Sequence, residues 1–75
     1  MRIDMYHTTE GYGLEYWDGD GLHTIATGID GSASAVLTAK KWLKDRGVKN
    51  ATIMGAFGTI WEITGCVVKR YNPSN

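Results

Sequence analysis

Two histidines, one cysteine and several carboxylates are the side chains of this sequence that could do chemistry. His7 and His23 could meet across neighbouring predicted strands, and Cys66 is the one further soft ligand. Zinc usually takes three or four protein ligands, so these residues predict no metal centre. Cys66 stands in a Gly-Cys-Val-Val segment typical of a strand, which predicts a buried, inert thiol rather than a nucleophile.

The acidic residues do not form a metal-binding set either. Asp4 lies on the first predicted strand, as an acid does in the ribonuclease H fold, where strand and helix acids hold two divalent metals. The predicted helix lacks a glutamate, and its one acid, Asp45, is near its C-terminal end. Asp18-Gly19-Asp20-Gly21 resembles the start of a calcium loop but lacks a terminal acid, which favours a hairpin turn.

No glycine-rich phosphate loop is present, because Gly11-Tyr12-Gly13 is followed by a predicted strand and not by a helix. We therefore predict that the chain has no catalytic residues, binds no cofactor or metal, and is not an enzyme.

Aromatic residues are the most informative feature of so short a chain. Tyr16 and Trp17 are adjacent on a predicted strand and must face opposite ways, as Trp61 and its neighbours must. Trp42 belongs to the apolar side of the predicted helix and is expected in the core. At least one large aromatic residue therefore faces away from the core. Exposed aromatic residues anchor protein interfaces and stack on unpaired bases.

Hydrophobic periodicity predicts the elements that position these residues. Alternation with period two indicates strands, and a glycine break after residue 27 leads to a helix capped by Asp30 or Ser32 and ended by Gly47. The helix has one apolar stripe, formed by Ala35, Val36, Ala39, Trp42 and Leu43. The predicted strands are 3–8, 14–17, 22–27, 51–54, 59–64 and 66–71, the last being a sixth strand or a continuation of the fifth.

The expected fold class is α+β, with a mainly antiparallel five- to six-stranded sheet in the order β-β-β-α-β-β and one helix packed on one face. A chain of 75 residues supplies a single hydrophobic core, so residues 1–75 form one domain with a frayed tail at 72–75. One helix covers about three strands, which leaves the other face of the sheet to solvent or to a partner.

Eight basic and eight acidic residues cancel, so the chain is not a polybasic nucleic-acid binder. Most acids precede residue 31 and most bases follow it. The single cysteine excludes an internal disulfide, the N-terminus is polar, and no apolar run reaches the roughly 20 residues that span a bilayer. These features predict a soluble cytoplasmic protein.

The layout of a three-stranded meander, one helix closed by Lys-Asp-Arg-Gly, and a final hairpin resembles two groups of proteins. One is the HicB-type antitoxins, whose partial ribonuclease H fold lacks catalytic acids; these chains carry an acidic segment where this one has Thr24 to Gly28. The other, closer in size and in the strand Lys49 to Gly55, is the small phage-encoded anti-CRISPR and anti-defence inhibitors. That resemblance implies a protein that binds and blocks a host complex.

The sequence thus predicts a non-catalytic protein-binding module, and the resemblance implies a phage-type inhibitor of a host defence complex. Its expected contact surface is the helix-free face and rim of the sheet, and the helix lysines are further candidates. The candidate partner-binding residues are Tyr16, Trp17, Trp61, Lys40, Lys41 and Lys44. Two alternatives stay open: a nucleic-acid-binding module using the same lysines with Lys69 and Arg70, and a structural homodimer.

Overall fold

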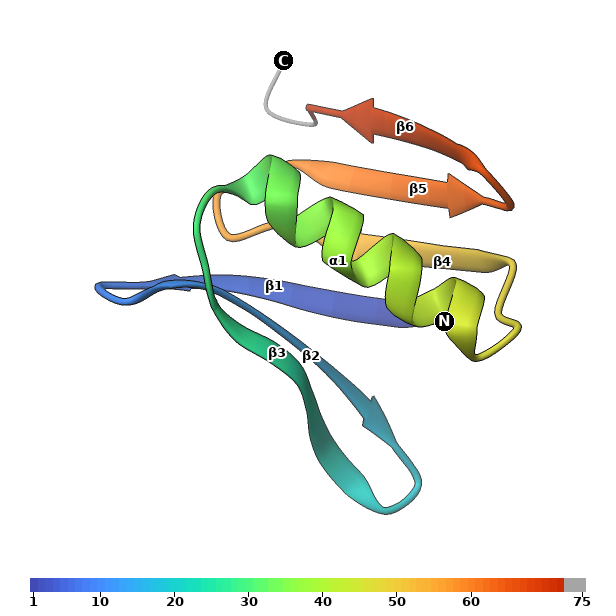
Figure 1. The fold of residues 1–75 in the computed structure, drawn as a ribbon, viewed down its shortest axis with the longest axis horizontal. Helices are drawn as coiled ribbons and strands as arrows, with labels where there is room; N and C mark the ends of the chain where they lie inside the picture. The colour runs from blue at the N-terminus through green and yellow to red at the C-terminus, as the bar shows by residue number, and fades with distance from the viewer. Residues whose placement is uncertain (73–75) are drawn as a thin grey trace.

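The computed structural model describes residues 1–72 as a six-stranded sheet with one helix across a face (Figure 1). The elements are β1 (Arg2–Thr8), β2 (Gly11–Asp18), β3 (Gly21–Ile29), α1 (Ser32–Asp45), β4 (Asn50–Met54), β5 (Ile60–Thr64) and β6 (Val67–Tyr71). The predicted α+β class and element order are confirmed, and the last segment is a separate sixth strand. Most of the predicted tail at 72–75 lies outside the described residues.

The strand order in the sheet is β3-β2-β1-β4-β5-β6. Sequential neighbours pair antiparallel, whereas β1 and β4 pair parallel at the centre. The pair is parallel because α1 carries the chain back across the sheet, so that β4 runs in the same direction as β1. Parallel strands need a crossover connection of this kind. Within residues 1–72, α1 lacks the length and apolar composition needed to span a membrane.

A tight turn joins β2 to β3, as the Asp-Gly repeat predicts. Asp18 Oδ1 accepts a hydrogen bond of 2.7 Å from the backbone N–H of Asp20, and Gly21 takes a φ of 123° where β3 begins. Only glycine adopts that φ without strain. The preceding turn lies at residues 9–10, so β2 begins at Gly11, three residues before the predicted start at residue 14.

The pairing of β2 with β3 contains two irregularities, between Tyr12 and Leu14 and between Leu14 and Glu15. At each, β3 holds one residue more than β2, as in a β-bulge, which bends a strand and increases its twist. In Figure 1 the β2–β3 ribbon accordingly turns away from the rest of the sheet. The bent ribbon places the Asp18 turn at a corner of the molecule.

The helix packs through the predicted stripe: Ala35, Val36, Ala39 and Leu43 are buried, and Trp42 is half-buried against them. The predicted N-cap is wrong. Gly31, with a φ of 92°, occupies the cap position, and within residues 1–72 no side chain caps this end.

The core lies between α1 and one face of the sheet. It is formed by the four helix residues together with Ile3, Met5, Leu14, Ala51, Ile53 and Ile63 from the strands. Because strand side chains alternate, the residues on either side of each of these point to the opposite, helix-free face. That face is the surface on which the candidate site lies.

Candidate functional site on the helix-free face

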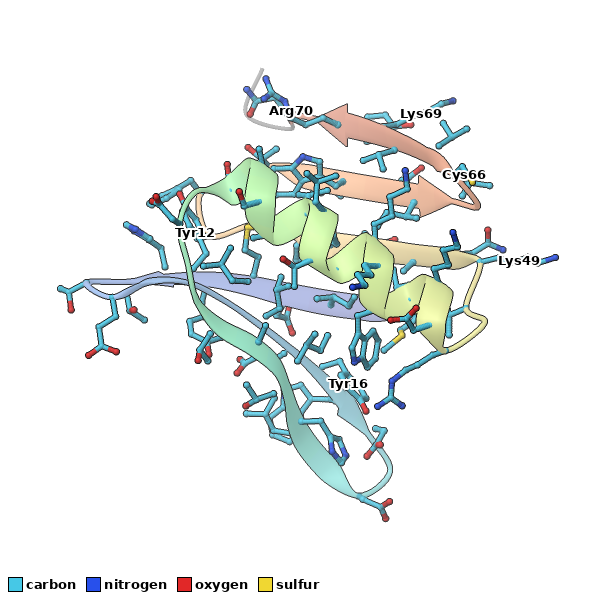
Figure 2. All side chains as sticks on the ribbon, in the orientation of Figure 1. Tyr12, Tyr16, Lys49, Cys66, Lys69 and Arg70 are labelled. Carbon is cyan, nitrogen blue, oxygen red and sulfur yellow. The ribbon has the colours of Figure 1, made fainter. Side chains whose placement is uncertain are left out.

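Tyr16 does not line the helix-free face. Its ring stacks on His23 at 5.0 Å between centroids and meets Trp42 of α1 at 5.2 Å. The reason is the phase of β2: Tyr16 is two residues from buried Leu14 and shares its side of the sheet. The expected place of Tyr16 is therefore wrong (Figure 2).

Trp61 is also on the helix side of the sheet. It is two residues from buried Ile63 and packs against the core, and its ring crosses Gly55, where an added Cβ would lie 2.7 Å from Cζ3. The expectation that Trp61 anchors a surface on the helix-free face is therefore wrong as well. Gly55 leaves the space that this ring occupies.

Trp17 does point away from the core, as predicted for at least one aromatic residue. Its side chain is 67% exposed. It pairs across the hairpin with Leu22, which is 47% exposed, and it shares a shallow hollow with Arg2 and Asp4 of β1. Trp17 is thus the one predicted aromatic anchor on the helix-free face.

The strand register extends this surface across the whole sheet. Residues that pair directly on adjacent strands share a face, and the pairs join into two rows. The first row is Leu22, Trp17, Arg2, Thr52, Glu62 and Lys69. The second row is Thr24, Glu15, Asp4, Met54, Ile60 and Tyr71. We use "helix-free face" for these twelve residues.

Charges of both signs lie among apolar side chains on this face. Its acids are Asp4, Glu15 and Glu62 and its bases are Arg2 and Lys69, so three negative and two positive charges give a net charge of −1. Arg2 and Asp4 form an ion pair at 3.2 Å. Two exposed aromatic side chains lie on this face, Trp17 on β2 and Tyr71 on β6. Such a mixture of aromatic, aliphatic and polar groups is typical of protein interfaces.

Sequence reasoning missed Leu22, Met54, Ile60 and Tyr71 as members of this face. The signal was present in the alternation: Ile60 is one residue from Trp61 and three from buried Ile63, so it must take the other side. Assigning that phase requires knowing which residue of each strand enters the core.

The three helix lysines lie on the other side of the molecule. Lys40 Nζ donates a hydrogen bond of 3.0 Å to the carbonyl oxygen of Cys66, while Lys41 and Lys44 are exposed. The predicted partner-binding residues are therefore divided between two opposite surfaces. The set proposed for nucleic acid divides too, because Lys69 belongs to the helix-free face and Arg70 pairs with Trp61 on the helix side (Figure 2).

The two histidines considered as zinc ligands have different neighbours. The His7 ring contacts Tyr12 and Phe57, and His23 contacts Tyr16 across the hairpin. Residues 1–72 contain no group of three or more His, Cys, Asp or Glu side chains that could hold a metal ion.

Cys66 is exposed, so the expected burial of its thiol is wrong. β5 ends at Thr64, and Gly65, with a φ of 61°, and Cys66 form the turn into β6. The Gly-Cys pair is thus the two-residue turn of a β-hairpin, and the next strand, β6, begins at Val67.

Asp18, a charged residue directly after Trp17, ends β2 at the corner of the molecule. Its pKa is lowered from 3.8, first by the hydrogen bond from the N–H of Asp20 and then by the side chain of His23. His23 Nε2 lies 2.9 Å from Asp18 Oδ2, without hydrogen-bond alignment. Asp18 thus stays ionised at neutral pH and holds the turn that ends the Trp17 strand.

Comparisons of the chain with protein-family models, with curated proteins and with solved structures found no match.

Proposed function

We propose that this chain is a non-catalytic protein-binding module and that it binds its partner with the helix-free face. The observation that carries this proposal is Trp17, two-thirds exposed beside Leu22 on a sheet face that no helix of residues 1–72 covers. Large exposed aromatic residues on a rigid strand lose little conformational entropy on binding and provide much contact area.

The charges of this face favour a protein over a nucleic acid. With a net charge of −1, the helix-free face offers phosphates little attraction. Interspersed charges instead select a partner surface of complementary pattern. We propose, in line with the resemblance described above, that the partner belongs to a host defence complex which the bound module blocks. The free cysteine is consistent with a reducing, cytoplasmic setting.

The test is a tagged pull-down from lysate of the cell in which the protein acts, with wild type and Trp17→Ala compared by mass spectrometry. A protein captured by wild type and lost with Trp17→Ala supports the proposal. The matched control is Leu37→Ala, because Leu37 is 64% exposed on α1 and lies on the opposite side from Trp17.

Two other results would replace the proposal. Recovery of the protein's own copies alone would indicate a structural homodimer. Recovery of nucleic acid that is lost after nuclease treatment or at raised salt would indicate the nucleic-acid module, which Lys40, Lys41 and Lys44 on one helix favour.

A further inference from the structure

A second candidate binding site lies on the helix side, where a cavity of about 360 Å³ opens between the C-terminal half of α1 and the β5–β6 turn. Its floor is apolar and includes Leu43, Val48 and Ile63. Leu43 and Ile63 are almost fully buried, so they are fixed by the core. The volume is in the range of cavities that hold small molecules, roughly 300 to 1,000 Å³.

The end of α1 keeps this floor in place. Val48 N–H donates to the Leu43 carbonyl at 2.9 Å, and Gly47 N–H donates to the Lys44 carbonyl at 3.1 Å. This pair of bonds is the Schellman motif, which brings the residue after the turn back onto the last helical turn. It also occupies two of the carbonyl oxygens that would otherwise present negative charge at this helix end.

Three lysines, Lys40, Lys44 and Lys49, line the cavity together with the apolar floor. Lys40 is held across the edge of the cavity by its hydrogen bond to the Cys66 carbonyl. Within residues 1–72, none of the three forms an ion pair with a carboxylate. Figure 2 shows Lys49 and Cys66 at the same end of the sheet, beyond the C-terminal half of α1.

We propose that this cavity binds a small amphipathic anion, namely a carboxylate attached to an aliphatic body. The aliphatic part would lie on Val48 and on the aliphatic stems of the lysines, above the buried side chains of Leu43 and Ile63, and the carboxylate would pair with Lys44 and Lys49. A bare anion would leave these apolar groups exposed, and an uncharged alcohol would leave the ammonium groups without a partner. Both parts of the ligand are therefore needed for affinity.

The single cysteine offers a direct readout, because Cys66 lines the cavity and is exposed. Sodium octanoate should slow the alkylation of Cys66 by iodoacetamide in a saturable way. Acetate and octanol at the same concentrations should protect far less, since each supplies one half of the ligand. Wild-type protein without ligand gives the reference rate for each comparison.

Lysine variants distinguish this cavity from a general attraction to the basic helix. Lys44→Gln and Lys49→Gln should each weaken octanoate protection by about three- to fivefold, the upper range for an ion pair between exposed groups. Lys41→Gln is the matched control, because Lys41 is on the same helix but does not line this cavity, and should change protection less than about twofold. Protection is expressed for each variant relative to its own rate without ligand.

Equal protection by octanol, or octanoate protection that survives Lys44→Gln and Lys49→Gln, would overturn the proposal. A second measurement on the wild type needs no variant: octanoate should shift the backbone amide NMR signals of Val48 and Cys66, and a shift confined to other residues would also overturn it. Trp17→Ala should leave the protection unchanged, so this test is independent of the proposed function.

Discussion

Gly13 leaves room for the ring of Tyr6 on the helix-free side of the sheet. The two residues pair directly between β1 and β2, and a Cβ placed on Gly13 would lie 2.2 Å from Tyr6 Cζ. Gly13 has no positive φ, so the side chain of Tyr6, and not the backbone, makes this position specific for glycine.

We expect Gly13→Ala to lower the free energy of unfolding by about 1–3 kcal/mol, because the ring must leave its place over the strand. Urea denaturation of the single and double variants measures the effect. In a Tyr6→Ala background the same substitution should cost much less, since the clash is gone. An equal cost in both backgrounds would show that the ring is not the cause.

Asp18 gives a prediction about pH. Its pKa is lowered in the folded protein, so ionised Asp18 stabilises the fold above its ordinary pKa of 3.8, and this contribution is lost as the pH falls through the lower folded pKa. Asp18→Asn keeps an oxygen for the Asp20 N–H but removes the charge. The melting temperature of Asp18→Asn should fall below that of wild type at neutral pH and approach it in acid.

Asp18→Ala removes both the charge and the acceptor of the turn. It should therefore melt below Asp18→Asn at neutral pH and stay below wild type in acid too, where a protonated carboxyl still accepts a hydrogen bond. Thermal melts followed by circular dichroism between about pH 2 and pH 7 separate the two contributions. Identical melting of both variants at every pH would contradict the role assigned to the turn.

At the level of the elements, the end of α1 depends on one glycine. Gly47 has a φ of 71°, and no atom lies within 4 Å of an added Cβ, so the cost of substitution is purely conformational. Gly47→Ala should reduce the free energy of unfolding by about 1 kcal/mol, measured by urea denaturation.

Gly19 is the control, because it is also free of close neighbours but has no positive φ. Gly19→Ala should be neutral or slightly stabilising, since alanine restricts the unfolded chain without straining the turn. If Gly47→Ala proved as harmless as Gly19→Ala, the Schellman end of α1 would not hold the chain in place.

Much of the fold follows from local patterns in the sequence. Alternation, turn residues and β-forming residues located the strand segments, although they left open whether the last is a sixth strand or part of the fifth. Gly11 and Ile29 extend β2 and β3 beyond their predicted bounds, and the helical stripe was correct from Ala35 to Leu43. The cap at Gly31 was missed because no side chain identifies it. Strand order could not be derived, since the β1–β4 pair joins residues that are fifty positions apart in the sequence, such as Ile3 and Ile53.

The site was less predictable than the fold for a physical reason. Tyr16 and Trp17 have nearly equal apolar character, so composition alone does not decide which of them enters the core. Leu14, which is fully buried, sets the phase of β2 and sends Tyr16 to the helix side. The same reasoning from Ile63 would have placed Trp61 correctly.

For the molecule as a whole, the two sides of the sheet differ in charge. The helix side carries unpaired lysines around an apolar cavity, and the helix-free face carries both signs among apolar side chains. The acids of the first thirty residues lie on β1, on β2, in their turns and, for Asp30, in the loop before α1. Four of the five lysines lie on or next to α1, and Lys69 lies on β6. Two surfaces of such different chemistry suit two different ligands, which is why we assign the protein partner to one and the small anion to the other.

The measurement that tests the central claim most directly is the affinity of the captured partner for wild type, Trp17→Ala and Leu37→Ala. Binding through the helix-free face predicts a loss of about thirtyfold or more for Trp17→Ala, as for an interface hot spot, and a change of less than about twofold for Leu37→Ala. The two side chains are exposed by similar fractions, so a general dependence on exposed apolar surface would lower the affinity of both variants. Full affinity of Trp17→Ala, with loss in Leu37→Ala, would contradict the account and place the partner on the helix.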